Sequence, residues 1–231
     1  MSAISKTARL TGDMRDKIAK HSGRRGRSVT TSSERKKPRN SHIFARDEHD
    51  HYVEPEWVSE RLFDVEQFQG PILDPACGWS RILTSARKHG YRVRGSDIAN
   101  RVGARHPDFR VLDFLMQQDA STWQWWANAG SCVSNPPFDK FKEFYRQASA
   151  LGFSKIAMLW LVRRLNAATW LQNTPLEKIY LLTPRPSMPT GAHILSGGKV
   201  GGGKQDFCWL VWSLLRQSSS PALHWLHRDA S

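Results

Sequence analysis

Seven short, mainly apolar segments follow one another between residues 71 and 214, and segments with apolar side chains at helical spacing separate most of them. This pattern predicts strands at Pro71–Asp74, Tyr91–Asp97, Phe109–Asp113, Ser131–Asn135, Lys155–Leu161, Lys178–Thr183 and Phe207–Leu214. It predicts helices from Pro55 onward and at Ser80–His89, Gln117–Ala127, Lys140–Leu151 and Asn166–Gln172. Alternating strands and helices predict an α/β fold with a mostly parallel sheet and helices on both faces.

The first 46 residues have a different composition. They are rich in Ser, Thr, Lys and Arg, contain few large apolar residues, and hold +10 of the chain's net charge of +13. We therefore expect a disordered basic N-terminal tail at 1–46 and one folded domain at 47–231. A basic tail favours nucleic acid as a partner, whereas a solubilising extension is the alternative. The basic residues expected to contact phosphates here are Arg24, Arg25, Arg27, Lys36 and Lys37.

Several classes of protein are not expected. No apolar stretch reaches the length of a membrane span, and charged residues interrupt every candidate signal peptide near the start. The three cysteines are far apart and form no CxxC motif, which favours reduced thiols in a cytoplasm. We expect no metal site, because His49 and His51 are better explained as part of a solvated loop.

Each of the first three predicted strands ends in an aspartate. Asp74 opens the segment Asp74-Pro75-Ala76-Cys77-Gly78, which lacks the glycine spacing of dinucleotide and triphosphate sites and suits a cationic or zwitterionic ligand. Asp97 can accept hydrogen bonds from ribose hydroxyls. Asp113 can accept one from an adenine amino group while Phe114 or Leu115 packs on the ring. Any one of these acids alone is explained by a helix cap, but three in register favour a nucleoside-containing ligand.

The fourth strand is followed by Asn135-Pro136-Pro137-Phe138. Two prolines cannot continue a strand and form a stiff turn. The Asn135 side-chain oxygen and the Pro136 carbonyl can accept the hydrogens of an exocyclic amine and orient its lone pair, while Phe138 offers a flat surface to an extruded base. The alternative is a plain turn with a capping Asn before the next helix.

These motifs together resemble the class I (Rossmann-like) methyltransferases, and specifically the amino-methyltransferases with an N-P-P-F/Y signature. The resemblance covers roughly Tyr52 to Leu215 and implies a seven-stranded methyltransferase sheet, S-adenosyl-L-methionine as cofactor, and a planar amine as acceptor. By that resemblance the cofactor-binding residues are Tyr52, Pro55, Asp74, Ala76, Cys77, Gly78, Asp97, Ile98, Asp113 and Phe114, and the catalytic residues are Asn135, Pro136, Pro137 and Phe138. The chain departs from the family at Ser80, where a second glycine is common, and at Glu54, where threonine is usual.

A glycine-rich stretch, residues 197–204, lies between the last two predicted strands. With Arg185 it resembles segments of small phage and bacterial adenine methyltransferases. A glycine-rich loop with Lys199 and Lys204 can close over a nucleic-acid backbone, with a plain flexible hairpin as the alternative, and the proline-flanked Arg185 is a candidate contact to a phosphate or base.

The leading hypothesis is therefore a cytoplasmic enzyme of a bacterial or phage-infected cell that methylates adenine N6 in DNA. An RNA substrate is the second hypothesis, a protein glutamine substrate the third, and a non-catalytic nucleic-acid-binding protein the fourth. No membrane partner is expected, and the oligomeric state is left open.

Overall fold

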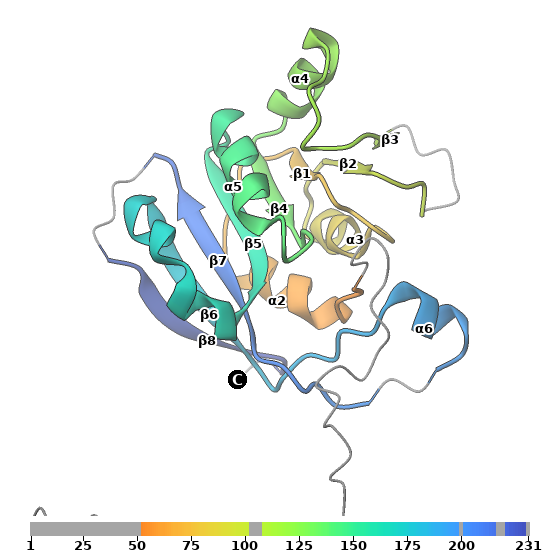
Figure 1. The fold of residues 1–231 in the computed structure, drawn as a ribbon, viewed down its shortest axis with the longest axis vertical. Coiled ribbons are helices and arrows are strands. Elements are labelled where there is room, and N and C mark those ends of the chain that lie inside the picture. The colour runs from red at the N-terminus through yellow and green to blue at the C-terminus, as the bar shows by residue number, and fades with distance from the viewer. Residues whose placement is uncertain (1–51, 102–107, 199–200, 216–219, 230–231) are drawn as a thin grey trace, which may run out of the picture. The chain divides into compact units, whose positions relative to one another are not determined.

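The computed structural model describes residues 52–101, 108–198, 201–215 and 220–229. Its centre is an eight-stranded sheet with the strand order β3-β2-β1-β4-β5-β7-β6-β8 (Figure 1). Strand β7 runs antiparallel to β5 and β6, and the other neighbouring strands pair in parallel. The strands are β1 Ile72–Asp74, β2 Val93–Asp97, β3 Phe109–Val111, β4 Ser131–Ser134, β5 Lys155–Leu161, β6 Leu176–Thr183, β7 Phe207–Ser213 and β8 Ala222–His227.

Helices cover both faces of this sheet, and each face has its own hydrophobic core. One core includes buried residues of α2 and α3, and the other includes buried residues of α4 and α5. Strand β5 contributes alternate residues to the two cores, as a central strand with both faces covered must. The helices are α2 Glu56–Val65, α3 Arg81–Lys88, α4 Ala120–Ala127, α5 Phe141–Ala150, α6 Gly191–Leu195, and the 3₁₀ helices η1 Val162–Ala167 and η2 Thr169–Asn173.

The predicted α/β fold class is confirmed, with three local differences. Strand β8 is an eighth strand that the sequence pattern did not predict, because only Leu226 of its six residues is buried. The predicted helix Asn166–Gln172 is instead the pair η1 and η2, and α6 was not predicted. The tail at 1–46, with its five proposed phosphate-binding residues, and Lys199 lie outside the described residues.

The order of the central strands creates the crevice in which such sheets bind ligands. The chain moves from β1 outward to β2 and β3, then returns to place β4 on the other side of β1. Ligands bind at this switch point, beyond the carboxyl ends of the strands. Asp74 ends β1 and Asn135 follows β4, so both lie at the switch point.

Within the part of the chain that the structure describes, no helix is long and apolar enough to cross a membrane.

A buried carboxylate anchors the end of α2. The Glu66 side chain, only 2% exposed, accepts hydrogen bonds from Lys155 Nζ, Lys178 Nζ and Tyr180 Oη, each at 2.6 Å. Burial opposes ionisation, but the hydrogen bonds from both lysines and the tyrosine hold the pKa of Glu66 below its ordinary value. The cluster fixes α2 against β5 and β6, and the segment just before α2 enters the crevice.

Replacement of Glu66 is expected to destabilise the domain. Glu66→Ala leaves two partly exposed lysines without their shared carboxylate and should lower the free energy of unfolding by about 1–3 kcal/mol. Because the folded-state pKa is depressed, the carboxylate's contribution is present above its ordinary pKa of 4.5 and is lost as pH falls through the lower folded value. Urea unfolding across the acid range measures both effects. Unchanged acid sensitivity in Glu66→Gln would contradict this assignment.

Ser80 at the start of α3 holds a backbone conformation that suits glycine better. Its φ is 62°, in the left-handed region, and its side chain makes no capping hydrogen bond to α3. Such a conformation costs a residue with a Cβ roughly 1–2 kcal/mol, whereas glycine adds about 0.4–1 kcal/mol of entropy to the unfolded chain. Ser80→Gly should therefore raise the free energy of unfolding by up to about 1 kcal/mol in chemical denaturation. Ser80→Ala is the control and should bring no gain; equal stabilisation by both variants would refute strain as the cause.

Candidate active site

Asp74 joins the two central strands of the crevice. Its carboxylate is 1% exposed, and Oδ1 accepts hydrogen bonds from Ser134 Oγ at 2.7 Å and from the Ala76 amide at 3.1 Å. Burial raises the pKa of Asp74 well above its ordinary value against these hydrogen bonds, and the nearby carboxylates of Glu54 and Asp97 add to the rise. The site therefore contains a buried acid that a cationic group would hold in its ionised form.

Asp97 contacts the same loop from the end of β2. Its Oδ2 accepts a hydrogen bond from the Gly78 amide at 2.9 Å, and its Oδ1 accepts one from the Ala99 amide at 3.0 Å. Gly78 has a φ of 48°, so a residue with a Cβ would be strained at this contact. The neighbouring Ile98 leaves 53% of its surface exposed and provides apolar surface beside the carboxylate.

Asp113 lies in the loop beyond β3, where its Oδ1 accepts a hydrogen bond from the Leu115 amide at 2.9 Å. Phe114 is enclosed in the core against Trp126 and Phe144, with ring centroids 5.0 and 5.3 Å away. Its ring is therefore not available to a ligand, which corrects the prediction for that side chain. Leu115, the alternative, is only partly buried.

Asn135 follows β4 and bonds to the segment that precedes α2. Its Nδ2 donates to the Tyr52 carbonyl at 3.1 Å and to Glu54 Oε2 at 2.9 Å. Phe138, after the two prolines, stacks on the Tyr52 ring with centroids 5.8 Å apart and planes at 14°. Its carbonyl accepts a hydrogen bond from Arg164 Nη1 at 2.6 Å. The Asn-Pro-Pro-Phe corner is thus fixed at both ends.

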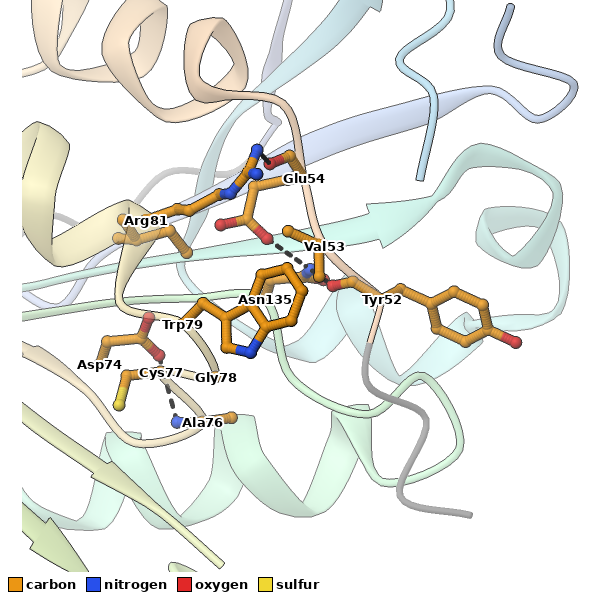
Figure 2. A pocket seen from close by; sticks show the side chains of 11 residues that line it. Tyr52, Val53, Glu54, Asp74, Ala76, Cys77, Gly78, Trp79, Arg81 and Asn135 are labelled. Atoms are coloured by element: carbon orange, nitrogen blue, oxygen red, sulfur yellow. Dashed lines mark hydrogen bonds between the residues drawn. The ribbon is translucent and has the colours of Figure 1, made fainter. Parts of the chain in front are cut away.

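One pocket brings the two predicted halves of the site together (Figure 2). It contains six of the predicted site residues, while Asp97 adjoins it through Gly78. Pro55, Ile98, Asp113, Phe114 and the residues 136–138 do not line it. Its lining comprises Tyr52, Val53, Glu54, Asp74, Ala76, Cys77, Gly78, Trp79, Arg81, Ile82 and Asn135.

Glu54 is a pocket residue that the sequence analysis did not assign to the site. It is 7% exposed, and burial raises its pKa although hydrogen bonds and the nearby Arg81 oppose the shift. Arg81 Nη1 also donates to the Glu54 carbonyl at 3.0 Å. The available signal was the glutamate itself, in the place where the resembled family has threonine before Pro55.

The two described residues that were predicted to contact nucleic acid near the C-terminal strands, Arg185 and Lys204, have different surroundings. Arg185 forms a two-pronged ion pair with Asp206, at 2.6 and 3.1 Å, and both side chains are 56% exposed. Lys204 is exposed. A Cβ on Gly203 would lie 2.4 Å from the carbonyl oxygens of Arg185 and Pro186, so the glycine-rich loop needs glycine where it crosses this segment. Arg185 is therefore held in an ion pair in this structure, and its contact with nucleic acid stays a prediction.

No family model matches the sequence, and no curated protein matches it. Among solved structures, the fold is similar to a predicted O-methyltransferase from Agrobacterium tumefaciens, at 12% identity and a TM-score of 0.49 over 74% of this chain and 85% of that one. It is also similar to the M protein of the type I restriction enzyme EcoKI, at 12% identity and a TM-score of 0.49 over 77% and 48% of the two chains. A dimethyladenosine transferase from Plasmodium falciparum is similar at 9% identity and a TM-score of 0.46 over 71% and 63%.

The arrangement of the chain itself carries the assignment of the fold. The order β3-β2-β1-β4-β5 is that of doubly wound nucleotide-binding sheets, and helices cover both faces. The acids at the ends of β1 and β2 meet at the switch point, beside the turn after β4. The protein has a Rossmann-like α/β fold.

Proposed function

We propose that the protein transfers a methyl group from S-adenosyl-L-methionine to the exocyclic N6 amino group of adenine in DNA. The observation that carries this proposal is the meeting of Asp74 and Asn135 in one pocket at the switch point. Ser134, the residue before Asn135, donates a hydrogen bond to Asp74. This bond links the proposed cofactor side of the pocket, at Asp74, to the proposed catalytic side, at Asn135.

The charge of the pocket fits this cofactor. Glu54 and Asp74 are both buried with raised pKa values, and Asp97 lies one hydrogen bond away. Buried carboxylates favour a ligand that brings positive charge, such as the sulfonium and ammonium groups of S-adenosylmethionine. We assign these groups to the side of the pocket near Asp74, the ribose to Asp97, and the adenine ring to the exposed surface of Ile98 with Asp113. When bound, S-adenosylmethionine would supply a methyl group carried on a positively charged sulfur. The methyl group would pass to an amine nitrogen as its carbon–sulfur bond breaks, and one amine proton would be released.

The residues after β4 fit a planar amine as the acceptor. The amide hydrogens of Asn135 are bonded to the protein, which leaves its Oδ1 and the Pro136 carbonyl to accept the hydrogens of the target amine. Such acceptors favour a pyramidal nitrogen with its lone pair directed at the methyl carbon, and rigid positioning of this kind supplies much of a catalysed rate. Phe138 is half-buried beside Tyr52 and provides an aromatic surface for a base outside its stack. The +10 tail supports a polyanionic substrate.

Methyl transfer and its dependence on Asn135 test the proposal directly. Tritium from labelled S-adenosylmethionine should appear on adenine N6 of DNA. Asn135→Ala should lower kcat by about 10²–10³-fold because the acceptor of the amine hydrogen is lost, while cofactor affinity stays within about threefold. Asn128→Ala, an exposed asparagine at the end of α4, is the matched control and should behave as the unaltered protein.

The distribution of label decides between the substrates. Label on RNA alone would overturn the DNA assignment, and label on protein glutamine would overturn the nucleic-acid assignment. No label in any pool, together with no cofactor binding in calorimetry, would overturn the methyltransferase proposal itself.

Cofactor affinity should depend on pH through the raised carboxyl pKa values. A cation binds the ionised acids, so the affinity for S-adenosylmethionine should rise with pH through the raised pKa values of Asp74 and Glu54 and then level off. Asp74→Asn should bind more weakly and with less pH dependence. Isothermal titration calorimetry from mildly acidic to mildly alkaline pH measures this, with the neutral-sulfur product S-adenosylhomocysteine as the control. Equal pH dependence for both ligands would show that the sulfonium charge does not contribute.

A further inference from the structure

The amide of Asn135 is held in one of its two possible orientations. Its nitrogen lies 3.1 Å from the Tyr52 carbonyl oxygen and 2.9 Å from Glu54 Oε2 (Figure 2). Rotation of the amide by 180° would place Oδ1 against the Tyr52 carbonyl oxygen and Glu54 Oε2. When Glu54 is ionised, neither of these two oxygens carries a hydrogen that it could donate. Both amide hydrogens are thus used within the protein, and Oδ1 remains as the acceptor.

From this arrangement we propose that Glu54 is a positioning residue, whose carboxylate orients the Asn135 amide so that Oδ1 faces the target amine. The inference rests on the proposed function, because only a substrate with amine hydrogens needs an acceptor at this point. Without the carboxylate, the Tyr52 carbonyl alone would hold the amide, and one hydrogen bond leaves the side chain free to turn. If the Asn135 amide turned, its NH₂ group would face the hydrogens of the target amine. The target amine would then approach less favourably.

The chain holds Glu54 in place from both sides. Before it, the Val53 amide donates to the Pro189 carbonyl at 2.9 Å, and Tyr52 pairs with Thr190 in an isolated antiparallel bridge. After it, α2 begins within two residues and ends at the Glu66 cluster. The backbone that carries the carboxylate is therefore fixed, and a group that orients another group must itself be held in place.

The charged groups around Glu54 come from two other elements. Arg81 of α3 donates to its carbonyl and stabilises its negative charge, while Asp74 of β1 interacts with it unfavourably. A protonated Glu54 would still keep one oxygen that can accept from Asn135 Nδ2. The hydrogen bond that orients Asn135 is therefore compatible with either protonation state of Glu54.

An exchange of acid and amide between the two positions tests the proposal. Asn135→Asp places two carboxyl groups in contact, where they need a shared proton. Adding Glu54→Gln to that variant restores a donor–acceptor pair with the direction reversed, and again leaves one free oxygen at position 135. Glu54→Gln alone retains an acceptor oxygen for Asn135 Nδ2, whereas Glu54→Ala retains none. Glu56→Ala, at an exposed glutamate two residues away, is the matched control.

The expected kinetic pattern is specific to positioning. Glu54→Ala should lower kcat by about 10–100-fold with little change in KM for DNA, since a small misplacement of an orienting group costs rates of this order. Glu54→Gln should keep a kcat near the unaltered value at saturating S-adenosylmethionine because it retains the acceptor oxygen, while its KM for S-adenosylmethionine should rise because the carboxylate charge is lost. Asn135→Asp should lose activity as pH rises and the shared proton leaves. The double variant should regain the flat pH profile and part of the rate, because the oxygen that replaces Asn135 Nδ2 still faces the Tyr52 carbonyl. A double variant no better than Asn135→Asp would overturn the proposal.

A measurement without methyl transfer separates this inference from the proposed function. The Asn135 side-chain NH₂ signals in a ¹⁵N spectrum should shift in Glu54→Ala and remain close to the original in Glu54→Gln. The melting temperature should fall in Asn135→Asp above neutral pH and recover in the double variant. If the unaltered protein labels no substrate but this coupling persists, the proposed function fails while the contact stands. If active protein shows no coupling, or Glu54→Ala keeps the full kcat, the positioning role of Glu54 fails alone.

Discussion

The hydrogen bond from Ser134 Oγ to the Asp74 carboxylate is the interaction on which the geometry of the site depends. It joins the carboxyl ends of β1 and β4, the two strands between which the chain changes direction across the sheet. Asp74 also accepts from the Ala76 amide, which sets the turn that brings the Gly78 amide to Asp97. Three adjacent strands are thereby linked at one edge, and the distance between Asp74 and the Asn-Pro-Pro-Phe turn is set by the spacing of neighbouring strands.

Two buried carboxylates in this domain show opposite electrostatic conditions. Glu66 meets two lysines and a tyrosine, its pKa is lowered, and its charge is balanced within the protein. Asp74 meets a hydroxyl, an amide and two other acids, and its pKa is raised. The charge of Glu66 is balanced by residues of the protein, so that arrangement stabilises the fold by itself. The ionised form of Asp74 is unfavourable until a ligand brings positive charge. A locally unfavourable group at the mouth of a doubly wound sheet is what a binding site requires and a core does not.

Much of the fold followed from local sequence patterns, and about half of the pocket residues were named from those patterns together with the family resemblance. The apolar run Lys155–Leu161 predicted β5 to the residue. The acids at strand ends predicted Asp74 in the pocket and Asp97 beside it, because parallel strands bring their carboxyl ends to one edge. Strand β8 was missed because it buries one residue and so leaves no periodic pattern. Phe114 was placed on a ligand although its ring fills the core, since sequence shows that an aromatic follows Asp113 but not which way it points.

Glu54 was missed for a deeper reason. Its partner Asn135 lies 81 positions away, and no local pattern encodes that contact. The prolines after Asn135 fix a backbone, but they leave open which end of the amide faces the ligand. That choice is made by acceptors from the segment before α2, which is itself held by Pro189 and the Thr190 bridge. The orientation of the Asn135 amide is therefore a property of tertiary structure. It arises only when the segment before α2 packs against both residues 189–190 and the turn after β4.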